Sequence, residues 1–246
     1  IMNGSAGLDQ KIDARRQLQS LFATAQLGYN EFVYLDLSAR NDWSSTLAYT
    51  SHEKSGFFYP SVGFSLIFNK LMTLPQWVSL AQIRGAYSMV GNDIPMFITN
   101  PSSHITAGGE FLASDAAPFK DMEPEMTHSF EVGIEARFLK NRIGLNATFY
   151  KTNTRNQFFK LPTLSGDKYA YRYVNAGDIQ NVGWEISLDA VPLLTNHFKW
   201  KTEVNFSTNR NKIISLHEAL KEFLYGPTSF SSSYAMKLVK GGSIGD

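Results

Sequence analysis

Hydrophobic and polar residues alternate one by one over long stretches of this chain. The clearest stretch is residues 130–138, in which every second residue is apolar. The residues between them are a Gly and the charged residues Glu131, Glu135 and Arg137. Because successive side chains of a β-strand point to opposite sides, this period of two predicts a strand with one apolar and one polar face. Residues 143–150 repeat the pattern after a short polar turn, which indicates a long antiparallel hairpin.

The same alternation recurs along the chain and divides each predicted strand into two unlike faces. The predicted strands are residues 21–29, 33–40, 61–68, 80–90, 130–138, 143–150, 182–190 and 198–207. Their apolar faces carry no charged residue, whereas charges recur on the opposite faces. Many of these runs are longer than the roughly 5–6 residues of an ordinary soluble strand and approach the roughly 9–11 residues with which a tilted strand crosses a bilayer.

The connections between the predicted strands alternate between short and long. The short ones are residues 30–31, 69–79, 139–141 and 193–197, and the long ones are residues 44–57, 92–123, 153–173 and 211–233. In an antiparallel sheet this order places every long loop at one rim, as in outer-membrane barrels with short periplasmic turns and long external loops. We therefore predict an all-β fold, namely a segment of an antiparallel up-and-down transmembrane β-barrel with short periplasmic turns and long extracellular loops.

Two further patterns concern the ends of the strands. Aromatic residues gather there, for example Trp43 beside a long connection and Trp200 beside a short one. This favours the aromatic girdles of a membrane barrel, with ordinary cross-strand packing as the alternative. Residues 216–224 have apolar residues at helical spacing and are followed by Gly-Pro, so we expect a short helix packed on the barrel rim.

Composition excludes several classes of function. The 23 basic and 22 acidic residues leave a net charge of +1, without the basic excess of a nucleic-acid binder. There is no Cys, which excludes disulfides, thiolate zinc sites and Cys nucleophiles. No nucleotide-binding, hydrolase or zinc-protease motif occurs, and the five His are scattered. We therefore expect no enzyme activity, no catalytic residues, no metal and no cofactor.

Several stretches of the chain form longer sequence motifs. One is residues 35–47, Leu-Asp-Leu-Ser-Ala-Arg-Asn-Asp-Trp-Ser-Ser-Thr-Leu, and another is the Asn-Ala-Gly segment within residues 173–185. The further matching stretches are residues 58–65, 123–135, 149–157, 200–213 and the glycine-rich 241–245. These stretches resemble the barrel motifs of the SusC/RagA-type TonB-dependent outer-membrane transporters. They occur in the order expected for that family, and the resemblance extends over nearly all of residues 15–246.

The resemblance implies a barrel of roughly 22 strands with a plug domain inside it, in the outer membrane of a Gram-negative bacterium. It also implies a SusD-like surface lipoprotein as a lid, and import of an oligosaccharide or peptide powered by TonB-ExbB-ExbD through the plug. We expect residues 1–246 to be part of one transmembrane barrel domain in contact with outer-membrane lipid. The plug, a signal peptide and the remaining strands are not found in this sequence.

Two groups of candidate site residues follow. A charge that faces lipid at mid-depth costs about 2–4 kcal/mol, so the charges of the polar faces should face the barrel lumen. The lumen-facing candidates are Asp36, Arg40, Arg84, Glu131, Glu135, Arg137, Glu185 and Asp189. The substrate-binding candidates on the long loops are Trp43, Tyr49, Tyr59, Tyr169, Tyr171, Arg172 and Tyr225. The alternatives are cross-strand charge pairing for the first group and structural loop aromatics for the second.

Two other classes of protein compete with the transporter interpretation. One is a soluble all-β carbohydrate-binding or adhesin module, in which the apolar faces would pack against a second sheet. The other is an outer-membrane barrel enzyme, to which His128, Ser129 and Glu131 could point, although their spacing matches no hydrolase motif.

Overall fold

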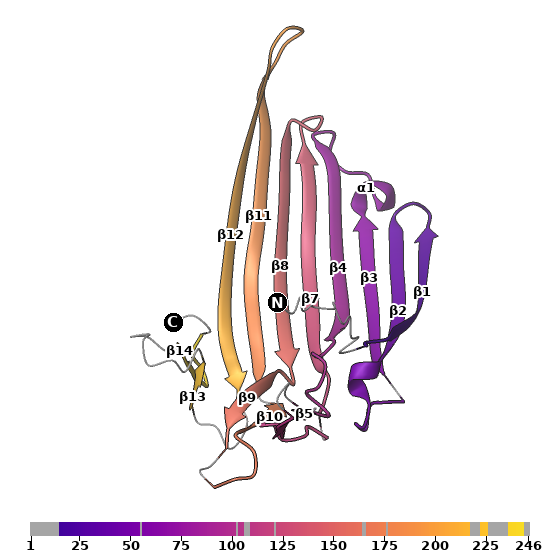
Figure 1. The fold of residues 1–246 in the computed structure, drawn as a ribbon. Coiled ribbons are helices and arrows are strands. Elements are labelled where there is room, and N and C mark those ends of the chain that lie inside the picture. The colour runs from indigo at the N-terminus through magenta and orange to yellow at the C-terminus, as the bar shows by residue number, and fades with distance from the viewer. Residues whose placement is uncertain are drawn as a thin grey trace, which may run out of the picture.

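A single antiparallel sheet dominates the structure, a computed structural model (Figure 1). The described residues are 15–54, 56–101, 103–105, 109–120, 122–163, 166–175, 177–216, 222–225 and 236–243. The sheet has eight strands in the order β1-β2-β3-β4-β7-β8-β11-β12, so each large strand pairs with the next large strand along the chain. Their bounds are β1 (Leu18–Tyr29), β2 (Val33–Ser44), β3 (Phe57–Ile67), β4 (Val78–Asn92), β7 (Glu125–Phe138), β8 (Ile143–Arg155), β11 (Asp178–Leu194) and β12 (Lys199–Ser215).

All eight strands predicted from the alternation are present, and the all-β, antiparallel up-and-down fold is confirmed. The sheet is open, with β1 and β12 at its edges, as expected of a segment of a larger barrel. Most strands are longer than predicted, and β11 and β12 each reach 17 residues. The added residues are largely polar, so backbone pairing continues where the alternation of apolar side chains has ended.

The connections are sorted by length between the two rims, as the sequence predicts. In Figure 1 the short connections lie at the upper rim and the long ones at the lower rim, so we call these the short-turn rim and the long-loop rim. The short-turn rim carries the four-residue helix α1 (Phe68–Leu71) between β3 and β4. Nearby, Lys70 Nζ donates a 2.7 Å hydrogen bond to Glu31 in the β1–β2 turn.

The long loops contain their own small elements. These are the 3-10 helix η1 (Ser45–Leu47) and three two-stranded sheets, β5 (His104–Ile105) with β6 (Phe111–Leu112), β9 (Phe158–Pro162) with β10 (Tyr171–Asn175), and β13 (Glu222–Tyr225) with β14 (Met236–Val239).

The helix expected at residues 216–224 is wrong at its C-terminal part, where residues 222–224 belong to β13. Residues 217–221 lie outside the described part of the chain. A short apolar run fits either a helix or a strand by periodicity alone, and here pairing with the distant β14 decides the outcome.

Among the described residues, the buried apolar side chains lie at the long-loop rim rather than along the sheet. The first rim core consists of Leu47, Phe57, Ile94 and Met122, and the second rim core of Phe159, Leu161, Ile213 and Leu238. Each joins strand ends to loop residues, so the long loops are packed structures. In the described part of the chain, no helix has the length and apolar character needed to span a membrane.

Candidate functional site

The two faces of the sheet differ in chemistry because the register keeps like residues in line. One cross-strand row contains Ile83, Ile134, Ala147, Ile186 and Phe206 on consecutive strands. The adjacent positions point to the other face and are mostly polar. The apolar face is strongly solvent-exposed, with Phe64 at 48% and Phe206 at 57% exposure. No second sheet covers it within the described residues, as a soluble sandwich would require.

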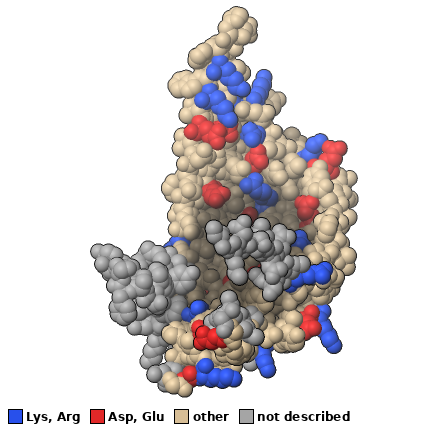
Figure 2. All heavy atoms as spheres, viewed as in Figure 1, with Lys and Arg blue, Asp and Glu red and all other residues tan. Residues whose placement is uncertain are grey.

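The opposite, polar face holds all of the charges predicted to face a lumen. By register and alternation these share one face: Asp36, Arg40, Arg84, Glu131, Glu135, Arg137, Glu185 and Asp189. Figure 2 shows acidic and basic side chains spread along this face, which is hollowed in its middle. The structure therefore brings these residues onto one wall and separates them from the apolar face.

Arg84 makes the longest reach across the polar face. Its Nη2 donates hydrogen bonds to Asn146 Oδ1 at 2.9 Å and to Thr148 Oγ1 at 2.9 Å, both on β8, which lies two strands from β4. The guanidinium passes over Gly133 on the intervening strand β7, where an added Cβ would lie 2.9 Å from Arg84 Nε. Gly133 thus gives space to a side chain of the same wall.

Two further glycines of the polar face serve neighbouring side chains in the same way. A Cβ at Gly144 would lie 2.2 Å from Asp189 Oδ1. A Cβ at Gly183 would lie 2.5 Å from the Tyr150 hydroxyl and 2.2 Å from the backbone oxygen of Thr208. Large polar side chains can therefore lie flat along this face of the sheet. Alternation within their strands places these glycines on the polar face, but their partners become evident only with the register.

Further short polar contacts connect some of the residues of this face. Gln26 donates to Asp36 at 2.7 Å, Gln82 donates to Ser65 at 2.6 Å, and Arg137 pairs with Glu135 at 3.0 Å. Exposed pairs of this kind contribute about 0–1 kcal/mol each, so the wall is not held together by its charges. No group of three or more His, Asp or Glu residues positioned to hold a metal occurs among the described residues. The polar face offers hydrogen-bond donors and acceptors, and side chains of both charges, to a ligand in contact with it.

Asn175 joins three chain segments at the long-loop rim. Its Nδ2 donates to the backbone oxygens of Glu123 at 2.8 Å and Asn156 at 2.6 Å, and its Oδ1 accepts from the Glu123 backbone N–H at 2.8 Å. The Asn156 side chain completes the cluster by donating to the Glu123 carboxylate at 2.8 Å. Asn175, the Asn of the Asn-Ala-Gly segment, therefore links separate loop segments through hydrogen bonds.

Asp93 is a second loop anchor, and sequence reasoning missed it. Its carboxylate accepts hydrogen bonds from Ser44 Oγ at 2.9 Å and Thr46 Oγ1 at 2.5 Å, and it pairs with Arg16. These contacts tie the end of β4 to the ends of β1 and β2. No local signal marks Asp93, because its partners lie 47 to 77 residues away.

The loop aromatics proposed to bind substrate do not form one cluster. Trp43 continues the apolar-face series of β2, and its Nε1 donates to the Lys54 backbone oxygen at 3.1 Å. Tyr49 is 71% exposed at a positive φ of 69°, and Tyr59 stacks on Phe57 with ring centroids 6.3 Å apart. Tyr225 lies in β13, but its side chain is outside the described part of the structure.

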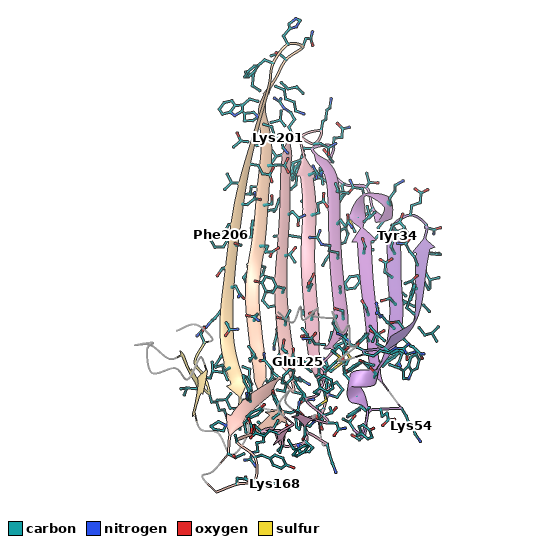
Figure 3. All side chains as sticks on the ribbon, viewed as in Figure 1. Tyr34, Lys54, Glu125, Lys168, Lys201 and Phe206 are labelled. Atoms are coloured by element: carbon teal, nitrogen blue, oxygen red, sulfur yellow. The ribbon has the colours of Figure 1, made fainter. Side chains whose placement is uncertain are left out.

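The three remaining candidates for substrate binding lie on or beside the hairpin of β9 and β10, and they are Tyr169, Tyr171 and Arg172. Lys160 Nζ sits 3.5 Å above the Tyr171 ring, and Tyr171 meets Tyr173 edge to face at 6.0 Å. Burial, with a smaller contribution from Tyr171, raises the pKa of the Tyr173 hydroxyl, so it stays neutral and can donate. Arg172 is exposed and Tyr169 precedes β10. Side chains crowd this rim around the labelled Glu125 and Lys168 in Figure 3.

Aromatic rings also mark the short-turn rim. Trp77 stacks on Phe138 at 5.6 Å, and Tyr29 meets Phe32 at 5.6 Å. Trp200 is 54% exposed at the start of β12, beside the short turn from β11. Exposed rings in a band at the edge of an apolar face are typical of the aromatic girdle of a membrane barrel.

Comparison with known proteins assigns the family. The family described as "TonB dependent receptor-like, beta-barrel" matches residues 2–222, so this chain belongs to it. TonB-dependent receptor P39 of Formosa agariphila is 24% identical over 208 residues, which cover 81% of this chain and 20% of P39. TonB-dependent receptor SusC of Bacteroides thetaiotaomicron is 24% identical over 227 residues, which cover 83% of this chain and 22% of SusC. The chain spans about a fifth of the length of these relatives.

Solved structures agree with this assignment at the level of the fold. The RagAB peptide importer in its "open-open" state superposes with a TM-score of 0.78 at 22% identity, covering 93% of this chain and 24% of that one. The siderophore receptor PirA of Pseudomonas aeruginosa reaches a TM-score of 0.53 at 15% identity, covering 80% of this chain and 35% of that one. The resemblance to SusC/RagA-type transporters is confirmed, and the family is one of receptors and transporters rather than enzymes.

Proposed function

We propose that this chain forms the wall and external loops of a TonB-dependent importer in the outer membrane of a Gram-negative bacterium. The observation that supports this proposal is that the two faces of one sheet differ in chemistry. One face carries exposed apolar side chains, and the other carries charged and hydrogen-bonded side chains. The apolar face contacts lipid and the polar face lines the lumen. Residues 1–246 belong to one barrel domain, completed in the longer protein by further strands and a plug.

The proposed cargo is an oligosaccharide or a peptide, admitted beneath a SusD-like lipoprotein lid and moved with energy from TonB-ExbB-ExbD. Similarity to a structure described as a peptide importer supports the peptide alternative. The aromatic and basic side chains on β9 and β10 suit either cargo, because rings stack on sugars or on peptide side chains. In this function the chain itself is passive and has no catalytic residue, and it supplies a binding surface and a path.

The membrane part of this proposal is tested on the full-length protein in its own cell. We expect it to fractionate with the outer membrane, to need detergent for extraction, and to shift on a gel when heated. A full-length protein that stays soluble after detergent is removed would overturn the proposal and favour a soluble binding module.

The cargo part is tested by deleting the full-length gene and supplying oligosaccharides or peptides as the limiting nutrient. Growth should fail on one of these classes and recover with the intact gene. A complementing gene with Tyr171→Ala should restore growth only in part if this ring contacts cargo. Full recovery with Tyr171→Ala would remove this residue from the proposed binding surface, and normal growth of the deletion strain on every cargo tested would contradict the import function.

A further inference from the structure

We propose that Lys151, Arg210 and Lys212 form a binding site for the phosphate groups of the phosphorylated glycolipid in the outer leaflet. This inference rests on the proposed membrane location. We call these three residues the outer cation group. They lie on β8 and β12, toward the long-loop rim of the apolar face.

The register places the outer cation group on the lipid side rather than in the lumen. Lys151 and Arg210 both stand opposite Val182 of β11, one from each side, and Lys212 stands opposite Gln180 two residues further along. Alternation puts Lys151 on the same face as Phe149, and Arg210 on the same face as Phe206. At strand spacings of about 4.8 Å and about 3.3 Å per residue, the three backbone positions lie within about 7–12 Å of one another.

The height of the group agrees with the level of lipid headgroups. Ile143 and Thr202 flank Ala190 in a row of the apolar face close to the short-turn rim, just inside Trp200. Lys151 is eight residues along β8 from Ile143, and Lys212 is ten residues along β12 from Thr202. With about 3.3 Å per residue and a strand tilt of about 40°, Lys151 and Lys212 lie about 20 and 25 Å from that row, in the direction of the long-loop rim. An apolar band is about 25 Å tall, so the cations stand at its outer boundary, where long side chains can extend toward the headgroups.

The charge of the group is not cancelled by its surroundings. Lys151, Arg210 and Lys212 are exposed, and none of them forms an ion pair with a described residue. The nearby carboxylate of Asp178 is already paired with Arg155 at 3.7 Å and accepts a hydrogen bond from Asn153 at 2.8 Å.

The polar residues beside the cations add neutral donors at the same level. Gln180 donates to Asn153 at 3.2 Å, and Tyr87 and His128 share a 2.8 Å hydrogen bond on the same face. At the opposite edge of the apolar face, β12 presents Trp200 instead of a cation. The two edges therefore differ, and the cationic edge is the one at the long-loop rim, where the outer leaflet lies.

The test uses the full-length protein in neutral detergent and measures binding of purified diphosphorylated lipid A by native mass spectrometry. The variant R210Q/K212Q is compared with K199Q/K201Q, which removes the same charge from the same strand but on its other face and near its short-turn end, where Lys201 is labelled in Figure 3. Adding K151Q completes the removal of the group.

We expect R210Q/K212Q to bind lipid A about tenfold or more weakly at low salt, the triple variant more weakly still, and the K199Q/K201Q control to bind like the wild type. Dephosphorylated lipid A should bind weakly to all of them. Folding of each variant is checked by the heat-induced gel shift, and if the triple variant does not fold the double variant decides the test.

Unchanged binding by R210Q/K212Q, an equal loss in K199Q/K201Q, or equal binding of dephosphorylated lipid A would each overturn the site. These outcomes differ from a failure of the proposed function, which would show as a full-length protein that is soluble without detergent.

Discussion

The clearest quantitative prediction concerns Ile134→Lys on the apolar face. Ile134 lies at the middle of the apolar residues of β7 and is 44% exposed, with Ile83 and Ala147 beside it in the same row. A Lys at the midplane of a bilayer costs about 2–4 kcal/mol on the lipid face of a barrel. This corresponds to a roughly 30- to 800-fold loss in the ratio of folded to unfolded protein.

The matched control is Ala86→Lys, which places the same side chain on the polar face of the neighbouring strand, directly opposite Glu131. We expect this change to cost at most about 1 kcal/mol, since the ammonium remains in water beside a carboxylate. Phe138→Lys tests the dependence on depth: it lies at the end of β7, where the cost of the charge should fall to about 0–1 kcal/mol, and loss of the ring contact with Trp77 adds about 0.5–1.5 kcal/mol.

The assay is equilibrium unfolding of the full-length protein by urea in phospholipid vesicles, followed by tryptophan fluorescence and the gel shift. Ile134→Lys should destabilise the protein more than Phe138→Lys and far more than Ala86→Lys. If Ile134→Lys costs no more than Ala86→Lys, the apolar face does not contact hydrocarbon and the assignment of the two faces is wrong.

Three further predictions follow from local contacts. Gly183→Ala should destabilise the barrel by about 1–3 kcal/mol in the same urea assay, and more than Gly133→Ala, because the added methyl at 183 meets a backbone oxygen whereas at 133 it meets a movable guanidinium. Asn175→Ala should speed hydrogen exchange and proteolysis in the adjoining loops, since three hydrogen bonds worth about 1 kcal/mol each are lost. The hydrogen bond from Lys70 lowers the pKa of the exposed Glu31 carboxyl, so the pair should persist until the pH falls through that lowered pKa. Carbon-13 NMR, with Glu31→Gln to assign the signal, should show this low titration, while the urea midpoint of Glu31→Gln stays unchanged because the pair is fully exposed.

The sequence predicts the large sheet well because its information is local. Period-two alternation places each strand and each face, and the lengths of the connections separate the rims. The ends of the strands were harder to predict: β12 continues to Ser215 through the polar residues 208–212 and two consecutive Ile, which show no alternation of hydrophobicity. The error at residues 222–224 has a related cause, since a short apolar run does not reveal whether its hydrogen-bond partner is the next turn of a helix or a distant strand.

The candidate site could be predicted only in part, because its contacts join residues that are distant in sequence. The charges of the polar face could be grouped by alternation, and the register places them together. The bonds of Arg84 to Asn146 and Thr148 span 62 and 64 residues, and those of Asn175 to Glu123 span 52. No pattern in one sequence specifies which distant residue such a side chain meets, so the loop anchors and the glycine clearances become evident only in the folded chain.

The meander topology also has a consequence for how the wall is assembled. Each large strand bonds only to its predecessor and its successor in the chain, so the sheet can grow by adding one hairpin at a time. The entropy of closing each hairpin then depends on the segment between its strands, which is residues 139–142 for β7–β8 but residues 93–124 for β4–β7. This difference of about eightfold in length adds about 2 kcal/mol to the closure. Pairing β7 with β4 therefore has the largest closure entropy in the eight-stranded sheet, and the anchoring of Asp93 beside the end of β4 shortens the segment that has to be closed.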